Sequence, residues 1–325
     1  MNSNIISLFS GAGGLDLGFK KAGFNIIWAN EYDKNIWETH EKNFPETILN
    51  KKSINLIDEK IVPNCIGMIG GPPCQSFSEA GAKRGTDDAR GKLFWDYIRI
   101  LKDKKPLFFV AENVSGLLAE RHKKDLEAFL KAFDESGYNV NVNLYNASNY
   151  GVPQDRERLI FVGYRKDLRK EFNPPEKETL KISLMNAIGD LDEPVASKNG
   201  GHNSFAINNH EYMLGGFSSM FLSRNRVRNW DEQSFTILAT ARQIPLHPKA
   251  PKMIKLGQDK FGFVKDAENE YRRLSVRECA RIQTFPDEFK FIYSKIEQGY
   301  KMVGNAVPVL LAEKIAKKIK NDLFN

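Results

Sequence analysis

Residues 4–14 read Asn-Ile-Ile-Ser-Leu-Phe-Ser-Gly-Ala-Gly-Gly, and this stretch sets how the chain begins to fold. Its apolar half predicts a strand over residues 4–9, and the apolar spacing after the glycines predicts a short helix over residues 15–23. A strand, a glycine-rich turn and a helix amino terminus together bring backbone N–H groups close to a cofactor. The stretch therefore indicates a cofactor-binding unit, although glycine loops are common and do not by themselves identify the ligand.

An acidic residue follows the second predicted strand, which covers residues 25–29. Glu31 comes just after this strand, about 20 residues past the glycine loop, where a carboxylate binds the ribose hydroxyls of a nucleoside-type cofactor. The alternative is a solvated carboxylate at the start of a helix. The residues alone leave both interpretations open.

The alternation of strand and helix continues along the first half of the chain. Further strands are predicted at residues 66–69, 106–111, 139–145 and 159–164, and helices at residues 93–101 and 123–136. This pattern predicts an α/β fold with a doubly wound, mostly parallel, Rossmann-like sheet. Beyond a segment rich in Pro, Glu, Lys and Asp the alternation is lost, so we expect a smaller, irregular second domain.

The carboxyl-terminal part contains signals for two helices. Ser275 and Glu278 have the spacing of a helix cap, in a segment that is helical to about residue 281. Residues 304–308 predict a tight turn that leads into a final amphipathic helix over residues 309–324.

Composition limits the class of protein. The chain has 325 residues, of which 41% are hydrophobic and 27% charged, as in ordinary globular proteins. No apolar run approaches the roughly 20 residues of a membrane span, and no signal peptide is visible, so we expect a cytoplasmic protein without membrane contact. Three widely spaced cysteines argue against a zinc motif or a disulfide framework, and no metal is expected. The net charge of +7 weakly favours a polyanionic partner.

Residues 69–78, Ile-Gly-Gly-Pro-Pro-Cys-Gln-Ser-Phe-Ser, place Cys74 on a rigid loop after a buried strand. In open α/β sheets this edge binds ligands, which suits a nucleophile, although an isolated cysteine is more often a buried structural residue. Glu112 follows another strand and brings a carboxylate to the same edge. Arg156 and Arg158 alternate just before a strand, so their side chains should point the same way.

Two segments of the second domain interleave arginines with Asn, Gln, Ser and Thr. Residues 220–230 read Met-Phe-Leu-Ser-Arg-Asn-Arg-Val-Arg-Asn-Trp, and residues 240–248 read Thr-Ala-Arg-Gln-Ile-Pro-Leu-His-Pro. Such residue types contact base edges and phosphates in DNA. A solvated basic face is the alternative. Residues 81–92, which are rich in Gly, Lys, Arg and Asp, read as a basic loop.

With these pieces in order, the chain resembles the cytosine-C5 DNA methyltransferase family over essentially its whole length. The resemblance rests on seven motifs, at residues 9–14 (Phe-Ser-Gly-Ala-Gly-Gly), 71–76 (Gly-Pro-Pro-Cys-Gln-Ser), 90–93 (Arg-Gly-Lys-Leu), 112–114 (Glu-Asn-Val), 154–158 (Gln-Asp-Arg-Glu-Arg), 272–278 (Arg-Arg-Leu-Ser-Val-Arg-Glu) and 304–308 (Gly-Asn-Ala-Val-Pro). Residues 223–228, Trp230, Gln243 and residues 246–248 are similar to the recognition segment of the HaeIII-type modification methylases, which modify GGCC.

The resemblance implies a site-specific DNA (cytosine-5-)-methyltransferase of a restriction–modification system that uses S-adenosylmethionine. The target cytosine is flipped out of the duplex, and the Cys74 thiolate adds to C6 so that C5 can take the methyl group. Glu112 would protonate or hydrogen-bond N3, Arg158 would hold O2, and Arg156 with Arg158 would lower the pKa of the thiol. The base that removes the C5 proton is not identified.

The resemblance also implies the domains and the binding residues. Residues 1–170 and 300–325 would form the cofactor-binding catalytic domain, and residues 171–299 the target-recognition domain. Cofactor binding would fall to Phe9, Ser10, Gly11, Gly13, Gly14, Leu15, Glu31, Tyr32, Pro73, Asn305 and Val307. Contacts to DNA would fall to Ser76, Arg84, Arg90, Arg224, Arg226, Arg228, Arg242 and Gln243. The partner would be double-stranded DNA, the protein a monomer, and a cognate endonuclease part of the same system without necessarily touching it.

One departure from the family is visible. An aspartate that usually contacts the cofactor's adenine amino group aligns with Ser53, and Asp58 could replace it only if the local register differs. The adenine contact is therefore left open.

Three other functions compete with this interpretation. An RNA (tRNA) cytosine-C5 methyltransferase would use the same catalytic residues, but the basic segment over residues 200–250 suits a reader of duplex DNA better. A nicotinamide oxidoreductase would use the glycine loop and the acid but not Gly-Pro-Pro-Cys. An inactive DNA-binding protein would have no need of Cys74, Glu112 and Arg158 together.

Overall fold

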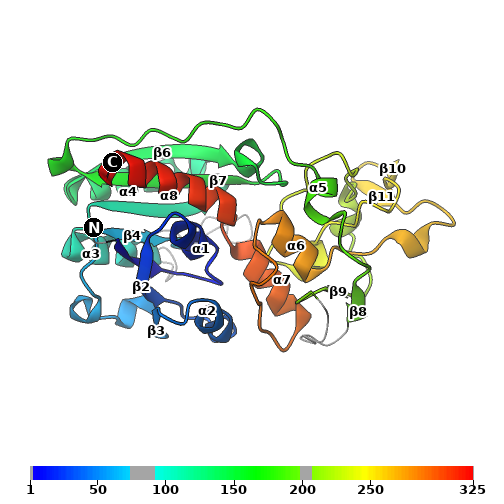
Figure 1. The fold of residues 1–325 in the computed structure, drawn as a ribbon. Coiled ribbons are helices and arrows are strands. Elements are labelled where there is room, and N and C mark those ends of the chain that lie inside the picture. The colour runs from blue at the N-terminus through cyan, green and yellow to red at the C-terminus, as the bar shows by residue number, and fades with distance from the viewer. Residues whose placement is uncertain (1–2, 74–91, 198–206, 325) are drawn as a thin grey trace.

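The computed structural model describes residues 3–73, 92–197 and 207–324. A seven-stranded sheet with the order β3-β2-β1-β4-β5-β7-β6 forms the left lobe in Figure 1. Its strands are β1 (Asn4–Leu8), β2 (Asn25–Asn30), β3 (Ile48–Asn50), β4 (Gly67–Gly70), β5 (Phe108–Val114), β6 (Tyr138–Asn146) and β7 (Glu157–Arg165). The doubly wound, mostly parallel α/β fold that the sequence predicts is confirmed.

The last strand departs from the parallel pattern. Strands β1 to β5 pair in parallel, whereas β7 lies between β5 and β6 and pairs antiparallel with both. A parallel neighbour needs a long crossover, usually a helix, but residues 147–156, which join β6 to β7, contain only a 3-10 turn over Ala147–Tyr150. The chain therefore reverses there, and β7 presents its first residues at the edge where β5 ends.

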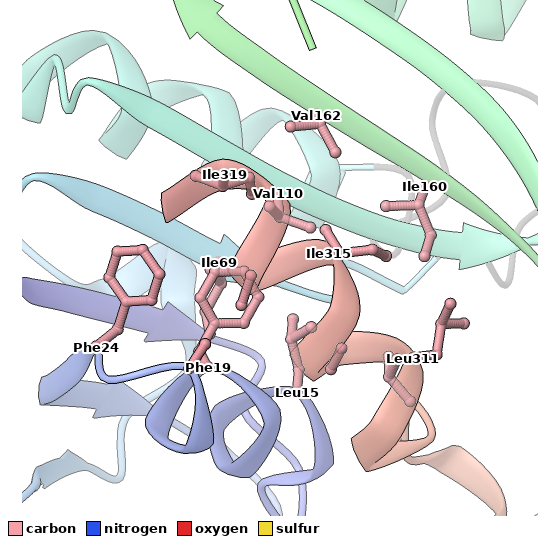
Figure 2. Packing of buried hydrophobic residues seen from close by; sticks show 14 of the residues in the cluster. Leu15, Phe19, Phe24, Ile69, Val110, Ile160, Val162, Leu311, Ile315 and Ile319 are labelled. Atoms are coloured by element: carbon pink, nitrogen blue, oxygen red, sulfur yellow. The ribbon is translucent and has the colours of Figure 1, made fainter. Parts of the chain in front are cut away.

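Helices cover both faces of the sheet. Helices α1 (Gly14–Lys21) and α8 (Val309–Phe324) pack on one face, and α3 (Lys92–Lys104) and α4 (Lys123–Glu135) on the other. Because side chains alternate along a strand, Phe108 and Val110 face α1 and α8, while Phe109 faces α3 and α4. Figure 2 shows the first of these cores, in which Leu15 and Phe19 of α1 meet α8.

The carboxyl-terminal helix returns to the beginning of the chain. In Figure 1 α8 runs back from the right lobe to lie beside α1, and both termini lie on the left lobe. Gly18 explains the closeness, since a Cβ there would stand 2.4 Å from the Cβ of Ala312. This packing joins α8 to the first lobe, and the domain boundaries stay a prediction.

The right lobe has short elements and no large sheet among its described residues. It contains α5 (Leu184–Ile188), β8 (Val195–Ser197), β9 (Glu211–Met213), β10 (Ile254–Gly257), β11 (Lys260–Gly262), α6 (Val276–Ile282) and α7 (Ile296–Asn305). Ser275 and Glu278 form a capping box at the start of α6, as the sequence predicts. The turn predicted at residues 304–308 begins later, because α7 continues to Asn305. None of the helices in the described ranges combines the length and apolarity that a membrane crossing requires.

One helix and one strand of the first lobe were too short or too polar to be located from the sequence. Helix α2 (Trp37–Asn43) reads Trp-Glu-Thr-His-Glu-Lys-Asn, and β3 has only three residues. Both are held by tertiary contacts, including the pairing of β2 with β3. Helix α2 brings His40 and Phe44 beneath the glycine loop.

Candidate active site

The glycine loop after β1 is tightly packed on one side and open on the other. Gly11 and Gly13 have positive φ angles of 55° and 93°, a backbone conformation that glycine adopts without strain. A Cβ on Gly13 would lie 2.2 Å from Cε2 of Phe44, whereas a Cβ on Gly11 would meet no atom within 4 Å. The loop therefore leaves room for a ligand at Gly11.

Glu31 lies directly against this loop. Its carboxylate accepts hydrogen bonds from the backbone N–H of Gly11, at 2.9 Å, and from that of Asp33, at 2.6 Å. Burial raises the pKa of Glu31, although these two N–H donors lower it. Tyr32 is exposed beside it, and the Trp37 indole donates to the Glu31 carbonyl at 2.8 Å. The acid and the loop that the sequence predicts to share a cofactor are thus in contact.

Residues after α7 complete this side of the site. A Cβ on Gly14 would lie 2.5 Å from the carbonyl oxygen of Val307, so the backbones of the loop and of the 304–307 turn touch. Asn305 is exposed, and Val307 is buried at the edge of the core that contains Leu15. Among the predicted cofactor residues, Leu15 buries its side chain in that core, so only its backbone is available to a ligand.

The remaining predicted cofactor residues surround the same edge. Phe9 has a positive φ of 53° and Ser10 hydrogen-bonds the carbonyl of Asn30 through its backbone N–H. Pro73 is half-buried and follows β4, next to β1 in the sheet. A glycine-lined space, a nearby carboxylate and an exposed amide are the groups that an adenosine-type cofactor needs, so the residues present fit S-adenosylmethionine.

Ser53 and Asp58 do not settle the adenine contact. Ser53 caps a 3-10 turn, and its hydroxyl donates to the side chain of Asn55 at 2.5 Å. Asp58 is exposed and accepts from the backbone N–H of Lys60 at 2.9 Å. Both side chains are engaged locally, and the contact stays open.

An ion pair occupies the carboxyl end of β5. Nε of Arg158 lies 2.8 Å from Oε1 of Glu112, and the two side chains are only 14% and 12% exposed. A Cβ on Gly71 would lie 3.2 Å from the other carboxylate oxygen of Glu112. The amide of Asn113 donates to the Pro72 carbonyl at 3.2 Å. Glu112 therefore lies next to the segment that leads into Cys74, and Arg158 is paired with Glu112.

Four predicted site residues, Cys74, Ser76, Arg84 and Arg90, lie outside the described residues.

Arg156 does not share the environment of Arg158. It is fully buried, and its guanidinium donates to the carbonyls of Ile237, Gly304 and Ala306 at 2.8–3.0 Å. Strand β7 begins only at Glu157, so strand alternation does not govern the direction of Arg156. The expectation that both arginines point the same way, toward the thiol, does not fit this arrangement. Burial and the nearby Arg158 lower the pKa of Arg156, and Glu112 raises it.

A polar hollow opens beside the ion pair. It has a volume of about 320 Å³ and is lined by Ser115, Asn146, Asp155, Glu157, Arg158 and Thr236, at the small end of ligand pockets. A larger, open hollow of about 460 Å³ on the surface of α3, around Trp95 and Arg99, contains no predicted site residue. The polar hollow therefore has the better position for a nucleotide.

The predicted DNA-reading residues fall into two groups. Arg224 and Arg242 are exposed, as a reader of base edges must be. Arg226 is only 5% exposed, and it donates to the carbonyls of Phe221 and Met220 and to the side chain of Gln243. These bonds use Nε and Nη2, so a bidentate grip on guanine would require Arg226 to release them. Contact of Arg226 with DNA therefore stays a prediction.

Arg228 is also engaged within the protein. Its guanidinium bonds Glu232 at 3.1 Å and Asp155 at 3.3 Å, and it stacks 4.2 Å above the ring of Phe235. Asp155 lies three residues before Arg158 and lines the same polar hollow. Arg228 therefore links residues 220–230 to the segment before β7, and its guanidinium does not extend freely into solvent.

Sequence reasoning missed two fully buried amides, Gln154 and Gln283. Gln154 belongs to the 154–158 motif, but only the two arginines of this motif were predicted to act at the site. Gln283 ends α6 with no local pattern to mark it. The side chain of Gln154 donates to that of Gln283 at 3.0 Å, so their role depends on contacts between distant segments.

Comparison with known proteins gives concordant matches. The family model for the C-5 cytosine-specific DNA methylases matches residues 3–321. The type II methyltransferase M.MthTI of Methanothermobacter thermautotrophicus is 54% identical over 327 residues, which cover 99% of this chain and 98% of that protein. M.NgoPII of Neisseria gonorrhoeae, also a type II methyltransferase, is 56% identical over 327 residues, which cover 98% of this chain and 96% of that protein.

A solved structure agrees at the level of the fold. A prophage-encoded E. coli protein described as a DNA modification methyltransferase superposes with a TM-score of 0.79 at 24% identity, over 99% of both chains.

Proposed function

The chain belongs to the family of C-5 cytosine-specific DNA methylases, and on that premise we propose that it methylates one cytosine of a GGCC site in duplex DNA. It is a DNA (cytosine-5-)-methyltransferase. S-adenosylmethionine is the proposed methyl donor, and residues 171–299 are the proposed target-recognition domain. The near relatives are type II methyltransferases, so a restriction–modification role with a cognate endonuclease is the proposed context.

The observation that carries the proposal is the ion pair of Glu112 with Arg158, beside the segment that leads into Cys74. Cytosine C5 is a weak nucleophile, and addition of the Cys74 thiolate to C6 makes the ring electron-rich enough to react. Electron density then moves to N3, where Glu112 donates a proton or hydrogen bond. Arg158 donates to O2, and its charge also favours the thiolate.

The bond changes balance in two steps. When bound, S-adenosylmethionine supplies the methyl group as a sulfonium. C5 takes the methyl group as the bond from that group to the sulfonium sulfur breaks, which leaves S-adenosylhomocysteine, while the Cys74 sulfur stays attached to C6. A base then removes the C5 proton, the C6–sulfur bond breaks, and Cys74 returns as a thiolate.

The target base must leave the duplex before these steps, at a cost of a few kcal/mol. The proposed place for the extruded base is the polar hollow next to Arg158. Thr236 lines this hollow, and its hydroxyl donates to the carbonyl of Asp155 at 2.6 Å. Exposed Arg224 and Arg242 are the proposed readers of guanine O6 and N7. We propose that Arg226 supports Gln243 and offers at most its free Nη1 edge to DNA.

Expression in a host that lacks cytosine methylation, followed by bisulfite sequencing of plasmid DNA, tests the proposed function. The expected result is protection of one cytosine in every GGCC site and of no other cytosine. Protection at a different sequence would overturn the proposed target. Transfer of labelled methyl groups to tRNA but not to DNA would instead favour the RNA methyltransferase. The enzyme is proposed to act as a monomer in the cytoplasm, where plasmid DNA is accessible to it.

A further inference from the structure

Three buried polar side chains form a network at the junction of the two lobes. Gln154, Arg156 and Gln283 are each fully buried. They come from the segment before β7 and from the end of α6, far apart in the sequence. Buried polar groups are costly unless they are hydrogen-bonded, so the partners of these side chains indicate what the network holds.

One side of the network grips the backbone of Ile237. The N–H of Ile237 donates to Oε1 of Gln154 at 2.8 Å, and the Ile237 carbonyl accepts from Nη1 of Arg156 at 3.0 Å. Both backbone groups of one residue are thus bound by two side chains of the 154–158 motif. Ile237 lies five residues before the exposed Arg242.

The other side grips the end of α7 and the turn after it. Nη2 of Arg156 donates to the carbonyls of Gly304, at 2.8 Å, and Ala306, at 3.0 Å. Nε2 of Gln283 donates to the carbonyl of Val303 at 3.0 Å, while its oxygen accepts from Gln154. The carbonyls that precede and follow Asn305 are therefore both held by Arg156.

The two gripped segments also touch each other directly. A Cβ on Gly304 would lie 2.4 Å from the backbone nitrogen of Ala239 and from the carbonyl group of Leu238. No side chain can separate these backbones. Arg156 therefore lies where the turn beside Gly14 meets the segment that leads to Arg242.

We propose that Arg156 is a positioning residue that, with Gln154 and Gln283, holds the cofactor turn at 303–307 in fixed register with the DNA-recognition segment at 237–243. This inference rests on the proposed function, which assigns the cofactor and the DNA to these two segments. Arg156 acts on both through their backbones, while Arg158, two residues on, meets the ion pair with Glu112. One buried network thus connects the three parts of the site.

Arginine is suited to this task because its planar guanidinium makes several hydrogen bonds in a fixed geometry. Lysine would keep the positive charge, but it has only one side-chain nitrogen. Arg156 uses two nitrogens, Nη1 for Ile237 and Nη2 for Gly304 and Ala306. Arg156→Lys therefore removes the simultaneous grip on both segments and leaves the charge.

A matched control exists in the same protein. Arg277 is also fully buried, and its guanidinium donates to the carbonyls of Asn208, Pro286 and Phe289 at 2.6–3.0 Å. None of these carbonyls belongs to the cofactor turn or to the 237–243 segment. Arg277→Lys should cost stability in the same way without changing the register of the site.

The experiment compares full-length wild type, Arg156→Lys and Arg277→Lys. Calorimetry gives the Kd of S-adenosylhomocysteine, and steady-state kinetics give KM and kcat with a GGCC duplex and with a duplex altered at one guanine. Thermal unfolding gives the stability of each variant. We expect Arg156→Lys to raise the Kd of S-adenosylhomocysteine at least tenfold and to reduce discrimination between the duplexes at least fivefold. Arg277→Lys should change both less than twofold at a similar loss of Tm.

A second variant keeps the proposal testable if Arg156→Lys fails to fold. Gln283→Met has a similar volume but cannot bond the Val303 carbonyl or the Gln154 amide, and it should raise the same Kd at least threefold. If Arg156→Lys, or this second variant in its place, keeps wild-type cofactor affinity and discrimination, the network is only structural and the inference is wrong. A wild-type protein that transfers no methyl group to DNA would instead overturn the proposed function.

Discussion

Replacing Gly13 and Gly11 by alanine should have different effects, because Gly13 lies on the packed side of the glycine loop and Gly11 on its open side. At Gly13 the φ of 93° forces alanine into a left-handed backbone, which costs about 1–2 kcal/mol. The new Cβ would also lie 2.2 Å from Cε2 of Phe44, far inside the roughly 3.5–4.0 Å of a normal carbon contact. Phe44 is buried against His40, with ring centroids 4.8 Å apart, so it cannot move freely.

Displacing such a ring costs roughly 1–3 kcal/mol. Gly13→Ala should therefore lower the free energy of unfolding by about 2–5 kcal/mol in total. Gly11→Ala carries only the backbone cost of about 1–2 kcal/mol, because no atom lies within 4 Å of its Cβ. That open space is the proposed cofactor side, so Gly11→Ala should raise the Kd of S-adenosylhomocysteine more than tenfold.

Urea unfolding and calorimetry on both variants measure these effects. If Gly11→Ala is as unstable as Gly13→Ala, the space at Gly11 is filled, and the loop has no open side there. If folded Gly11→Ala binds S-adenosylhomocysteine as tightly as the wild type, the cofactor does not approach the loop at this glycine. Either result would refute the prediction.

Other predictions address the catalytic acid, the recognition arginines and a buried histidine. Glu112→Gln should lower kcat roughly 100- to 10,000-fold with less effect on the KM for DNA, as measured in a methyl-transfer assay. Arg224→Ala should weaken binding to a GGCC duplex by about 1–3 kcal/mol without loss of Tm, whereas Arg226→Ala should lose about 1–3 kcal/mol of stability, because it leaves buried carbonyls unbonded. Burial lowers the pKa of His247 from its ordinary 6.5 to about 4, so the unfolded chain binds this proton first, and stability should fall by on the order of 3 kcal/mol as the pH drops from 6.5 to 4. His247→Asn should flatten that part of the profile in urea unfolding at several pH values, and an unchanged slope would assign it to other groups.

The first lobe was predictable because its strands are apolar runs that end at glycine, proline or polar residues. Residues 4–9, 106–111 and 159–164 all fall in strands within a few residues of their predicted bounds. The reversal of β7 was not predictable from alternation, since it depends on a connection too short for a helix. Helix α2 was missed because only Thr39 and His40 of its seven residues are buried, too few to form an apolar helical pattern.

The site shows a similar division. Glu31 could be predicted to meet the glycine loop, because position in a βαβ unit fixes both. The direction of Arg156 could not, since it precedes β7 and its partners, Ile237 and Gly304, come from distant segments. Arg226 read as a free arginine in a polar run, yet the aromatic ring of Phe221, 4.8 Å away, and two nearby carbonyls bind it. Local pattern identifies residue types, and tertiary contacts decide which of them remain free.

The most direct test of the proposed mechanism is a covalent adduct with DNA. A GGCC duplex with 5-fluorocytosine at the target base should form a denaturation-resistant complex with the wild-type protein in the presence of S-adenosylmethionine, because fluorine at C5 cannot leave as a proton does. Mass spectrometry of the digested complex should locate the nucleotide on Cys74, and Cys74→Ser should form no complex. An adduct on another residue, or one that persists in Cys74→Ser, would contradict the account.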